Sequence, residues 1–291
     1  FFFFKQKTAY EISTRDWSSD VCSSDLIKLN QTSNLRITAS QSVIRPELRE
    51  LSFLNIFDFE LNASVQGNPN LKRTKISNTD IRYELYPGSG EVLTAGVFYK
   101  NFENAIEQIF SEGSGGASTF SYQNAKKAIT YGVEVEARKK LNKFFTFQAN
   151  ASLVRSKIQD ENLKLERQLQ GQSPYLVNIG LLYDVVEKGF NATLLFNQIG
   201  ERIYLVGDMQ AGSASPDIYE APRALVDFQM SKKLMNNKAE IKFTISDLLN
   251  QQQTFYQNLN TNNPKYEKGV DAVRFSRKFG STFGISFNYS L

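Results

Sequence analysis

An alternation of apolar and polar residues with a period of two runs through this chain from Asn34 to Leu291. A period of two is typical of β-strands whose two faces meet different surroundings, because successive side chains of a strand point to opposite sides. Ten segments carry the alternation, and the apolar positions in each of them include no charged residue. The pattern therefore predicts an all-β fold in which every strand has one apolar face and one mostly polar face.

The two faces of each segment follow from its sequence. The apolar positions are, in chain order, Leu35, Ile37 and Ala39; Ile81, Tyr83 and Leu85; Leu93, Ala95, Val97 and Tyr99; Tyr131, Val133, Val135 and Ala137; Phe145, Phe147, Ala149, Ala151 and Leu153; Tyr175, Val177, Ile179, Leu181 and Tyr183; Phe190, Ala192, Leu194 and Phe196; Ala224, Val226, Phe228 and Met230; Ala239, Ile241, Phe243 and Ile245; and Phe283, Ile285, Phe287, Tyr289 and Leu291. The intervening positions are mostly polar. Leu176, Leu182 and Leu195 are exceptions, which we expect to pack against something inside.

The connections between these segments alternate between short and long. Short, turn-like connections are predicted at 87–90, 140–143, 186–189 and 234–237, and long polar ones at 42–74, 103–119, 157–173, 201–217 and 250–271. In a sheet of consecutive antiparallel strands, alternate connections lie on opposite rims, so one rim carries tight turns and the other long loops. This asymmetry is typical of outer-membrane barrels, and long loops in general are usually functional.

An apolar sheet face needs a cover, and the sequence leaves two covers open. In a soluble β-sandwich a second sheet would supply it, whereas in a membrane barrel lipid would. Several segments run to about 10 residues, the length that crosses a bilayer at a tilt. Tyrosines near segment ends, such as Tyr99, Tyr131 and Tyr183, suit the lipid–water interface. These features favour an antiparallel transmembrane β-barrel in the bacterial outer membrane, with the soluble sandwich as the alternative.

The first 26 residues do not follow the alternation. The stretches KQKTAYEI (5–12) and DWSSDVCSSDL (16–26) resemble translations of a sequencing-library adapter, and the four leading phenylalanines fit a homopolymer run. A signal peptide would need an apolar core before a small-residue cleavage site, and this segment has none. We therefore expect residues 1–26 to be non-native and the barrel domain to comprise residues 27–291.

Several short motifs in residues 27–291 resemble, in their order and spacing, the motifs of one protein family. They are RPELRELS (45–52), GNPNL (67–71), NTDIRYE (78–84), VFYK (97–100), YGVEVE (131–136) and DLLNQ (247–251), followed by an alternating segment that ends the chain. Together they resemble TonB-dependent receptors of Bacteroidota type. A final aromatic residue is frequent in such barrels, and this chain departs from that pattern by ending in Leu291 with Tyr289 nearby.

The resemblance implies a fold and a function beyond what the alternation gives. It implies a barrel of about 22 strands with a plugged lumen, of which this chain would form about ten C-terminal strands. The plug domain and the segment that contacts TonB would lie upstream and be absent here. It also implies a receptor that binds a nutrient at its extracellular loops and imports it with TonB-delivered energy. A passive porin, an adhesin-like barrel and a soluble binding sandwich remain the alternatives.

The composition gives little support to enzymatic chemistry. The chain has no His, which excludes Ser–His and Cys–His nucleophilic pairs and zinc sites built on His and Cys. Its one Cys, Cys22, lies in the segment that we expect to be non-native. The sequence has no phosphate-binding loop or dinucleotide fingerprint, and a formal net charge of +4 is too diffuse to indicate nucleic acid. We therefore expect neither an enzyme nor a resident cofactor or metal.

Two sets of residues are candidates for functional contacts. The alternative interpretation is that the first set is simply solvated and that the second packs within the loops. Charged residues at the polar positions of the strands are expected to face the plug: Arg36, Arg82, Glu84, Glu134, Glu136, Arg138 and Asp227. Residues in or beside the long outer loops are expected to touch the substrate: Arg45, Phe53, Phe57, Phe110, Phe120, Tyr122, Tyr204 and Tyr256.

Overall fold

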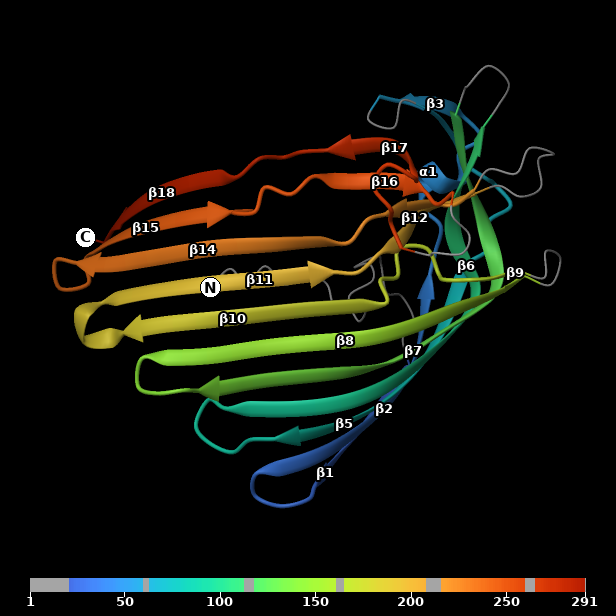
Figure 1. The fold of residues 1–291 in the computed structure, drawn as a ribbon. Helices are drawn as coiled ribbons and strands as arrows, with labels where there is room; N and C mark the ends of the chain where they lie inside the picture. The colour runs from blue at the N-terminus through green and yellow to red at the C-terminus, as the bar shows by residue number, and fades with distance from the viewer. Residues whose placement is uncertain are drawn as a thin grey trace.

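The computed structural model describes residues 21–59, 63–112, 118–160, 165–207, 216–259 and 265–290. Figure 1 shows a strongly curved antiparallel sheet, here called the wall, with short strands and loops gathered at one of its two ends. Residues 1–20, most of the segment expected to be non-native, and the terminal Leu291 lie outside the described residues.

Within the described residues the wall consists of eleven strands, each hydrogen-bonded to the next in antiparallel fashion. They are β1 (Val21–Lys28), β2 (Ser33–Ile44), β5 (Thr74–Leu85), β6 (Val92–Glu112), β7 (Ser118–Lys140), β8 (Phe145–Asp160), β10 (Tyr175–Val185), β11 (Phe190–Ile199), β14 (Arg223–Leu234), β15 (Ala239–Ser246) and β18 (Thr282–Tyr289). All ten predicted segments are wall strands, so the predicted antiparallel all-β fold is confirmed. The wall is an open sheet with β1 and β18 at its edges (Figure 1).

The strand β1 adds to the ten predicted ones and includes Val21–Leu26, which we expected to lie outside the fold. It pairs with β2 in regular register, from Val21 opposite Gln41 to Lys28 opposite Asn34. Such pairing uses only backbone N–H and C=O groups, which are common to all sequences. An extended segment of almost any composition can therefore occupy the edge of a sheet.

The two ends of the wall differ as predicted. At one end, short turns at 29–32, 86–91, 141–144, 186–189 and 235–238 join neighbouring strands. The turn before β15 is tight because Met235, Asn236 and Asn237 all adopt positive φ values of 51°, 53° and 69°, a conformation that Asn tolerates better than most residues. The turn before β11 contains the 3-10 helix η2 (Val186–Lys188) and ends at Gly189, whose φ of +57° favours glycine. The other end carries the long connections and is called here the long-loop rim.

At the long-loop rim, the hairpin formed by β6 and β7 extends past both of its neighbours. β5 pairs with β6 only as far as Glu103, and β8 pairs with β7 only as far as Lys127, whereas β6 and β7 pair with each other to Glu112 and Ser118. The prediction of a loop at 103–119 was therefore wrong for the described residues 103–112 and 118–119. Asn104 explains the error, because its φ of 55° interrupts the alternation: the buried position before it is Phe102 and the next is Ala105.

Short strands cover the two free edges of this extended hairpin and form an outer layer. β4 (Ala63–Gln66) runs parallel to β7, and β12 (Arg202–Gly207) runs parallel to β6. The pairing continues from β4 to β3 (Asn55–Asp58) and from β12 through β13 (Ile218–Glu220) and β16 (Gln253–Gln257) to β17 (Ala272–Arg277). The remaining elements at this end are β9 (Leu165–Arg167), paired with β8, and the helix α1 (Leu48–Leu51). No helix in the described residues has the length and apolar character needed to cross a membrane.

Seven side chains from β4, β6, β7, β12, β13 and β16 form the apolar core of the outer layer. They are Ala63, Val65, Phe110, Phe120, Leu205, Ile218 and Phe255. A guanidinium from β17, that of Arg274, lies 5.6 Å from the ring centre of Phe110 on β6, so the outer layer curls back on itself. A second core lies where the outer layer joins the wall and contains Ile76, Phe102, Ala105, Ala128, Ile158 and Leu169.

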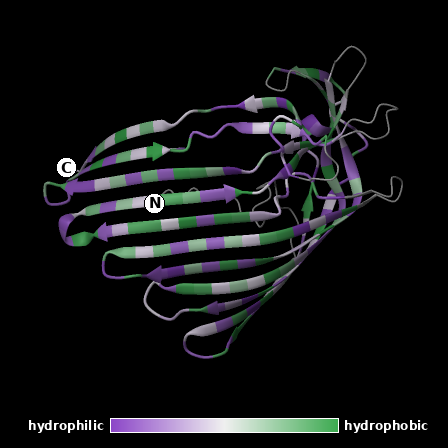
Figure 2. Ribbon diagram, viewed as in Figure 1, coloured by the Kyte–Doolittle hydropathy of each residue, from purple (hydrophilic) through white to green (hydrophobic). Residues whose placement is uncertain are grey.

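The predicted apolar face of the wall is its exposed, outward face. Val97, Val133, Leu153 and Ile285 are 53%, 46%, 66% and 79% exposed, and other large apolar side chains at the same alternate positions are also exposed. Figure 2 shows the resulting banding of apolar and polar residues along each strand. An uncovered apolar surface of this extent is unfavourable in water but suits the hydrocarbon core of a bilayer, where backbone groups must all be paired as they are within this sheet.

An arginine on the outward face is expected to destabilise the barrel because it places a charge in hydrocarbon. Val133→Arg and Phe147→Arg should each lower the free energy of unfolding by about 2–4 kcal/mol if near mid-bilayer, measured by urea unfolding in lipid vesicles. Gln148→Arg is the matched control, since Gln148 neighbours Phe147 on β8 at an inward position. Equal losses for Phe147→Arg and Gln148→Arg would contradict the facing assignment.

Candidate functional site

The inward face of β2, β5, β6 and β7 carries a group of charged side chains held by the strand register. Arg36 on β2 lies directly opposite Arg82 on β5, an arrangement of like charges that is unfavourable by itself. Each arginine instead pairs with a different carboxylate: Arg36 Nε donates to Glu84 Oε1 at 3.0 Å, and Arg82 Nη2 lies 3.8 Å from Glu134 Oε2. The Tyr86 hydroxyl also donates to Glu84, at 3.1 Å. These residues therefore form a continuous polar surface of paired charges.

Gly96 makes the second of these pairs possible. On β6 it lies between Arg82 of β5 and Glu134 of β7, directly opposite both. A side chain at this position would stand between the two charges, and its Cβ would come within 3.5 Å of the Cβ of Arg82. Glycine thus lets an ion pair form across an intervening strand.

The structure brings most of the predicted plug-facing residues together. Arg36, Arg82, Glu84, Glu134, Glu136 and Arg138 all lie at inward positions of β2, β5 and β7, and β6 lies between the last two strands. Lys100 on β6 also lies on this face, and the prediction missed it. The alternation could have shown it, because Lys100 follows Tyr99 of the apolar face and so occupies an inward position. Asp227 lies apart on β14, where its carboxylate accepts the backbone N–H of Asp247 at 2.8 Å and holds the turn of the DLLN motif. Whether any of these residues touches a plug stays a prediction.

The predicted substrate-contacting residues divide into exposed and buried groups. Phe53 and Phe57 are 74% and 48% exposed, beside α1 and on β3, and Arg45 is exposed after β2. Three of the other five, Phe110, Tyr204 and Tyr256, fall within predicted long loops but lie in strands β6, β12 and β16. Phe120 and Tyr122, beside the predicted loop at 103–119, lie in strand β7. The cause is the extension of the β6–β7 hairpin and the short strands that pair along its edges.

Burial changes what three of these aromatic residues can do. Phe110, Phe120 and Tyr256 are 2%, 3% and 0% exposed, and the Phe110 and Phe120 rings pack with centres 5.4 Å apart. Tyr204 packs its ring 4.4 Å from that of Phe255, and Tyr122 packs against the same core. In this conformation these five side chains shape the outer layer from within, whereas Arg45, Phe53 and Phe57 are exposed, and their contact with a substrate stays a prediction.

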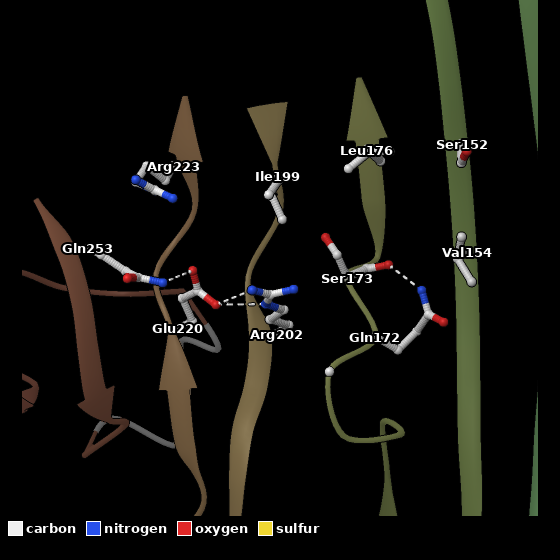
Figure 3. A pocket seen from close by; sticks show the side chains of 11 residues that line it. Ser152, Val154, Gln172, Ser173, Leu176, Ile199, Arg202, Glu220, Arg223 and Gln253 are labelled. Atoms are coloured by element: carbon white, nitrogen blue, oxygen red, sulfur yellow. Dashed lines mark hydrogen bonds and ion pairs between the residues drawn. The ribbon is translucent and has the colours of Figure 1, made fainter. Parts of the chain in front are cut away.

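A polar cavity of about 290 Å³ lies where the inward face meets the outer layer (Figure 3). Inward positions of four wall strands line it, with Ser152, Leu176, Ile199 and Arg223 among them. The connection at 171–173 and the strands β12, β13 and β16 supply the rest. On that side Arg202 donates to Glu220 Oε2 from Nε at 2.7 Å, while Gln253 donates to Oε1 at 2.7 Å. Leu176, which we expected to pack against something inside, lines this cavity. Such a lining can offer both hydrogen-bond donors and acceptors to a polar solute.

The described residues contain no group of three or more His, Cys, Asp or Glu side chains close enough to hold a metal ion. On the inward face, Arg36 pairs with Glu84 and Arg82 with Glu134.

A buried ion pair links β6 to β9 within the outer layer. Arg167 donates to Glu107 through both guanidinium nitrogens, with Nη1 to Oε1 at 2.9 Å and Nη2 to Oε2 at 2.5 Å. The Glu107 side chain is fully buried and that of Arg167 is 15% exposed. A two-pronged pair of this kind fixes geometry more strictly than a single contact.

Removing the carboxylate of this pair should destabilise the protein, because it leaves a buried guanidinium without its main counter-charge. Glu107→Ala is expected to lower the free energy of unfolding by about 3–5 kcal/mol, measured by urea unfolding in detergent micelles. Arg49→Ala is the comparison, since it breaks a more exposed pair with Asp58 and should cost less than about 1 kcal/mol. Similar costs for both variants would show that burial of the Glu107 pair adds nothing.

A second group of titratable residues lies in the outer layer around Tyr256, whose hydroxyl donates to Glu201 Oε2. Burial raises the pKa of Glu201 above its ordinary value, and the hydroxyl of Tyr256 and the backbone N–H of Tyr266 partly oppose this shift. Burial likewise raises the pKa of Asp217 and raises that of Tyr219 to about 12. The folded outer layer therefore binds protons on these carboxyl groups more tightly than the unfolded chain does.

The raised pKa of Glu201 predicts that the outer layer loses stability as pH rises. Protonation stabilises the folded layer below the ordinary carboxyl pKa, and this contribution disappears as pH rises through the raised pKa. Glu201→Gln keeps a neutral group at the site and should weaken that dependence. The measurement is hydrogen exchange of the β12 and β16 amides as a function of pH, corrected for intrinsic exchange rates. An unchanged pH dependence in the variant would contradict the assignment.

Comparison with known proteins gives matches at two levels. The sequence profile of the outer membrane protein beta-barrel family matches residues 26–289. The ferric enterobactin receptor PfeA of Pseudomonas aeruginosa has a similar structure, with a TM-score of 0.61 at 16% identity over 94% of this chain and 40% of that one. The copper transporter OprC gives 0.63 at 15% identity over 93% and 39%. The FrpB iron transporter of Neisseria meningitidis gives 0.57 at 11% identity over 93% and 39%.

These structural matches establish a shared fold, because identity is low in all three. The chain spans about two fifths of the length of each of these proteins. No sequence among the curated proteins matches it.

Proposed function

We propose, from the premise that this chain belongs to the outer membrane protein beta-barrel family, that it is the C-terminal barrel part of a receptor that imports a nutrient. The protein is located in the outer membrane. In the proposed mechanism, the outer loops and a plug domain encoded upstream capture the nutrient, and energy delivered through TonB displaces the plug. The motifs quoted above resemble those of receptors of Bacteroidota type, and this resemblance supports a receptor of that type.

The inward face is the observation that carries this proposal. Its paired charges, such as Arg36 with Glu84 and Arg82 with Glu134, form a structured surface rather than a scatter of solvated side chains. A surface with alternating donors and acceptors is suited to hold a folded domain in the lumen through hydrogen bonds and ion pairs. A water-filled pore needs no such fixed pairing, so the arrangement favours a plugged barrel.

The outer layer supports the capture step. It places exposed aromatic surface at Phe53 and Phe57 beside the long-loop rim, and it places the polar cavity beneath this rim. Binding residues are commonly positioned on loops by a rigid scaffold, and here a regular sheet positions them. Metal-bearing nutrients are one substrate class to test, because the structurally similar proteins named above include a ferric enterobactin receptor and a copper transporter.

Solute flux through the reconstituted barrel tests the proposal. The natural-length protein in lipid vesicles should be closed to small sugars in a swelling assay, because a plug fills the lumen. It should also bind the isolated periplasmic domain of TonB. The control is the same protein with its plug-coding region deleted, which should become leaky if it still inserts. Rapid swelling with the natural-length protein, without TonB binding, would contradict import and favour a passive porin.

A further inference from the structure

The outward face of β5, β7 and β8 changes from apolar to basic just beyond the apolar stripe on the long-loop side. On β8 the stripe ends at Leu153, which is 66% exposed, and the next two outward positions are Arg155 and Lys157. On β7 the positions after Tyr131 toward this rim are Ile129 and Lys127. On β5 the corresponding outward residue is Lys75. We call Lys75, Lys127, Arg155 and Lys157 the basic belt.

The direction of these side chains follows from their buried neighbours. Ile76, Phe102, Ala128 and Ile158 all lie in the inner core cluster where the outer layer joins the wall. Successive side chains of a strand point to opposite faces. The residues next to these four on β5, β6, β7 and β8 therefore point outward, toward the surroundings of the barrel.

The strand register places the belt residues close together. Lys75 lies opposite Glu103, and Glu103 lies opposite Lys127. Lys157 lies opposite Ile129, two residues from Lys127 along β7, which makes Lys127 and Lys157 diagonal neighbours about 7–8 Å apart. Glu103 is the acidic residue that stands among these four cations.

Arg155 lies at the level of an aromatic pair. It is directly opposite Tyr131, which is itself opposite Tyr99. Both tyrosines are exposed on the outward face, where aromatic rings mark the boundary between hydrocarbon and head groups. The belt thus stands at the depth of the lipid head groups.

The two rims differ in how they neutralise outward cations. On the short-turn side of β7, Lys139 occupies an outward position and its ammonium pairs with Glu91 at 3.2 Å. In the part of the chain that the structure describes, neither Lys127 nor Arg155 forms an ion pair. Clustered like charges on one sheet face repel each other, so an anion from outside the protein that lies beside Lys127 and Arg155 would stabilise the belt.

We propose that the basic belt binds the phosphate groups of anionic lipid head groups in the leaflet on the long-loop side. The position of the belt at the head-group level favours a membrane lipid over a free anion. The guanidinium of Arg155 can grip a phosphate with two hydrogen bonds, and the lysine ammonium groups add point charges around it. The long aliphatic stems of these side chains lie along the apolar surface while their charged ends reach the head groups. This binding does not depend on transport.

Lipid composition provides the test. The natural-length protein is placed in vesicles of phosphatidylcholine alone or of phosphatidylcholine mixed with phosphatidylglycerol, and its unfolding temperature is measured by the loss of heat-modifiable mobility on gels. Phosphatidylglycerol should raise the unfolding temperature, and high salt should remove most of this rise because ions screen exposed charges. The double variant Lys127→Gln and Arg155→Gln should lose more than half of the rise.

The control removes two positive charges elsewhere. The double variant Lys238→Gln and Lys268→Gln changes two exposed turns outside the belt. It should keep the full rise in unfolding temperature on addition of phosphatidylglycerol. The unfolding temperature of each variant in phosphatidylcholine alone corrects for any general loss of stability. A belt variant that responds to phosphatidylglycerol as fully as the unaltered protein would overturn the proposal. So would an equal stabilisation by inorganic phosphate in neutral detergent, which would indicate free-anion binding.

Discussion

Contact between the outward side chains and hydrocarbon is the interaction on which the rest of this structure depends. A strand that faces lipid cannot leave a backbone N–H or C=O unpaired, because no water is present to satisfy it. The wall meets this requirement by regular antiparallel pairing over long registers, such as the unbroken pairing of β2 with β5 from Ser33 to Ile44. Hydrocarbon also disfavours polar side chains on the outward face, so they gather on the other face and form the charged inward surface.

The outer layer solves a second problem, that of the free edges of an extended hairpin. Where β6 and β7 rise beyond their neighbours, each would present unpaired backbone groups to solvent and to other chains. β4 and β12 cover these edges in parallel orientation, and an aromatic core that includes Phe110 and Phe255 then forms on one side. The long connections therefore fold into the outer layer at the end of the wall, and the polar cavity lies beneath it.

The sequence alone was sufficient to predict the strands of the wall, because their two faces differ in composition. Residues such as Ile37, Val133 and Ile285 repeat every second position without charged interruptions, and each is exposed on the outward face. The outer layer was not predictable in this way. At Asn104 the left-handed backbone shifts the alternation, and in short strands such as β12 consecutive residues are buried together, so the period-two signal is lost. Tyr256, interpreted as a loop residue, is therefore fully buried.

The candidate site was predictable in part for the same reason. The inward charges of β2, β5 and β7 follow from the alternation, whereas their partners depend on register, as with Arg82 and Glu134 on either side of Gly96. The cavity combines inward wall positions with Arg202, Glu220 and Gln253 from separate outer connections. Contacts between segments so distant in the sequence depend on how the long connections fold back, and no local pattern specifies this.

The most direct measurement of hydrocarbon contact is fluorescence quenching by lipids that carry bromine on their acyl chains. The chain has one tryptophan, Trp17, in the segment that we interpret as non-native, so a tryptophan introduced into the natural barrel gives a clear signal. Val133→Trp should be strongly quenched in brominated vesicles, and Glu134→Trp, its inward neighbour on β7, should be quenched far less. Equal quenching of the two, or quenching of neither, would contradict the account.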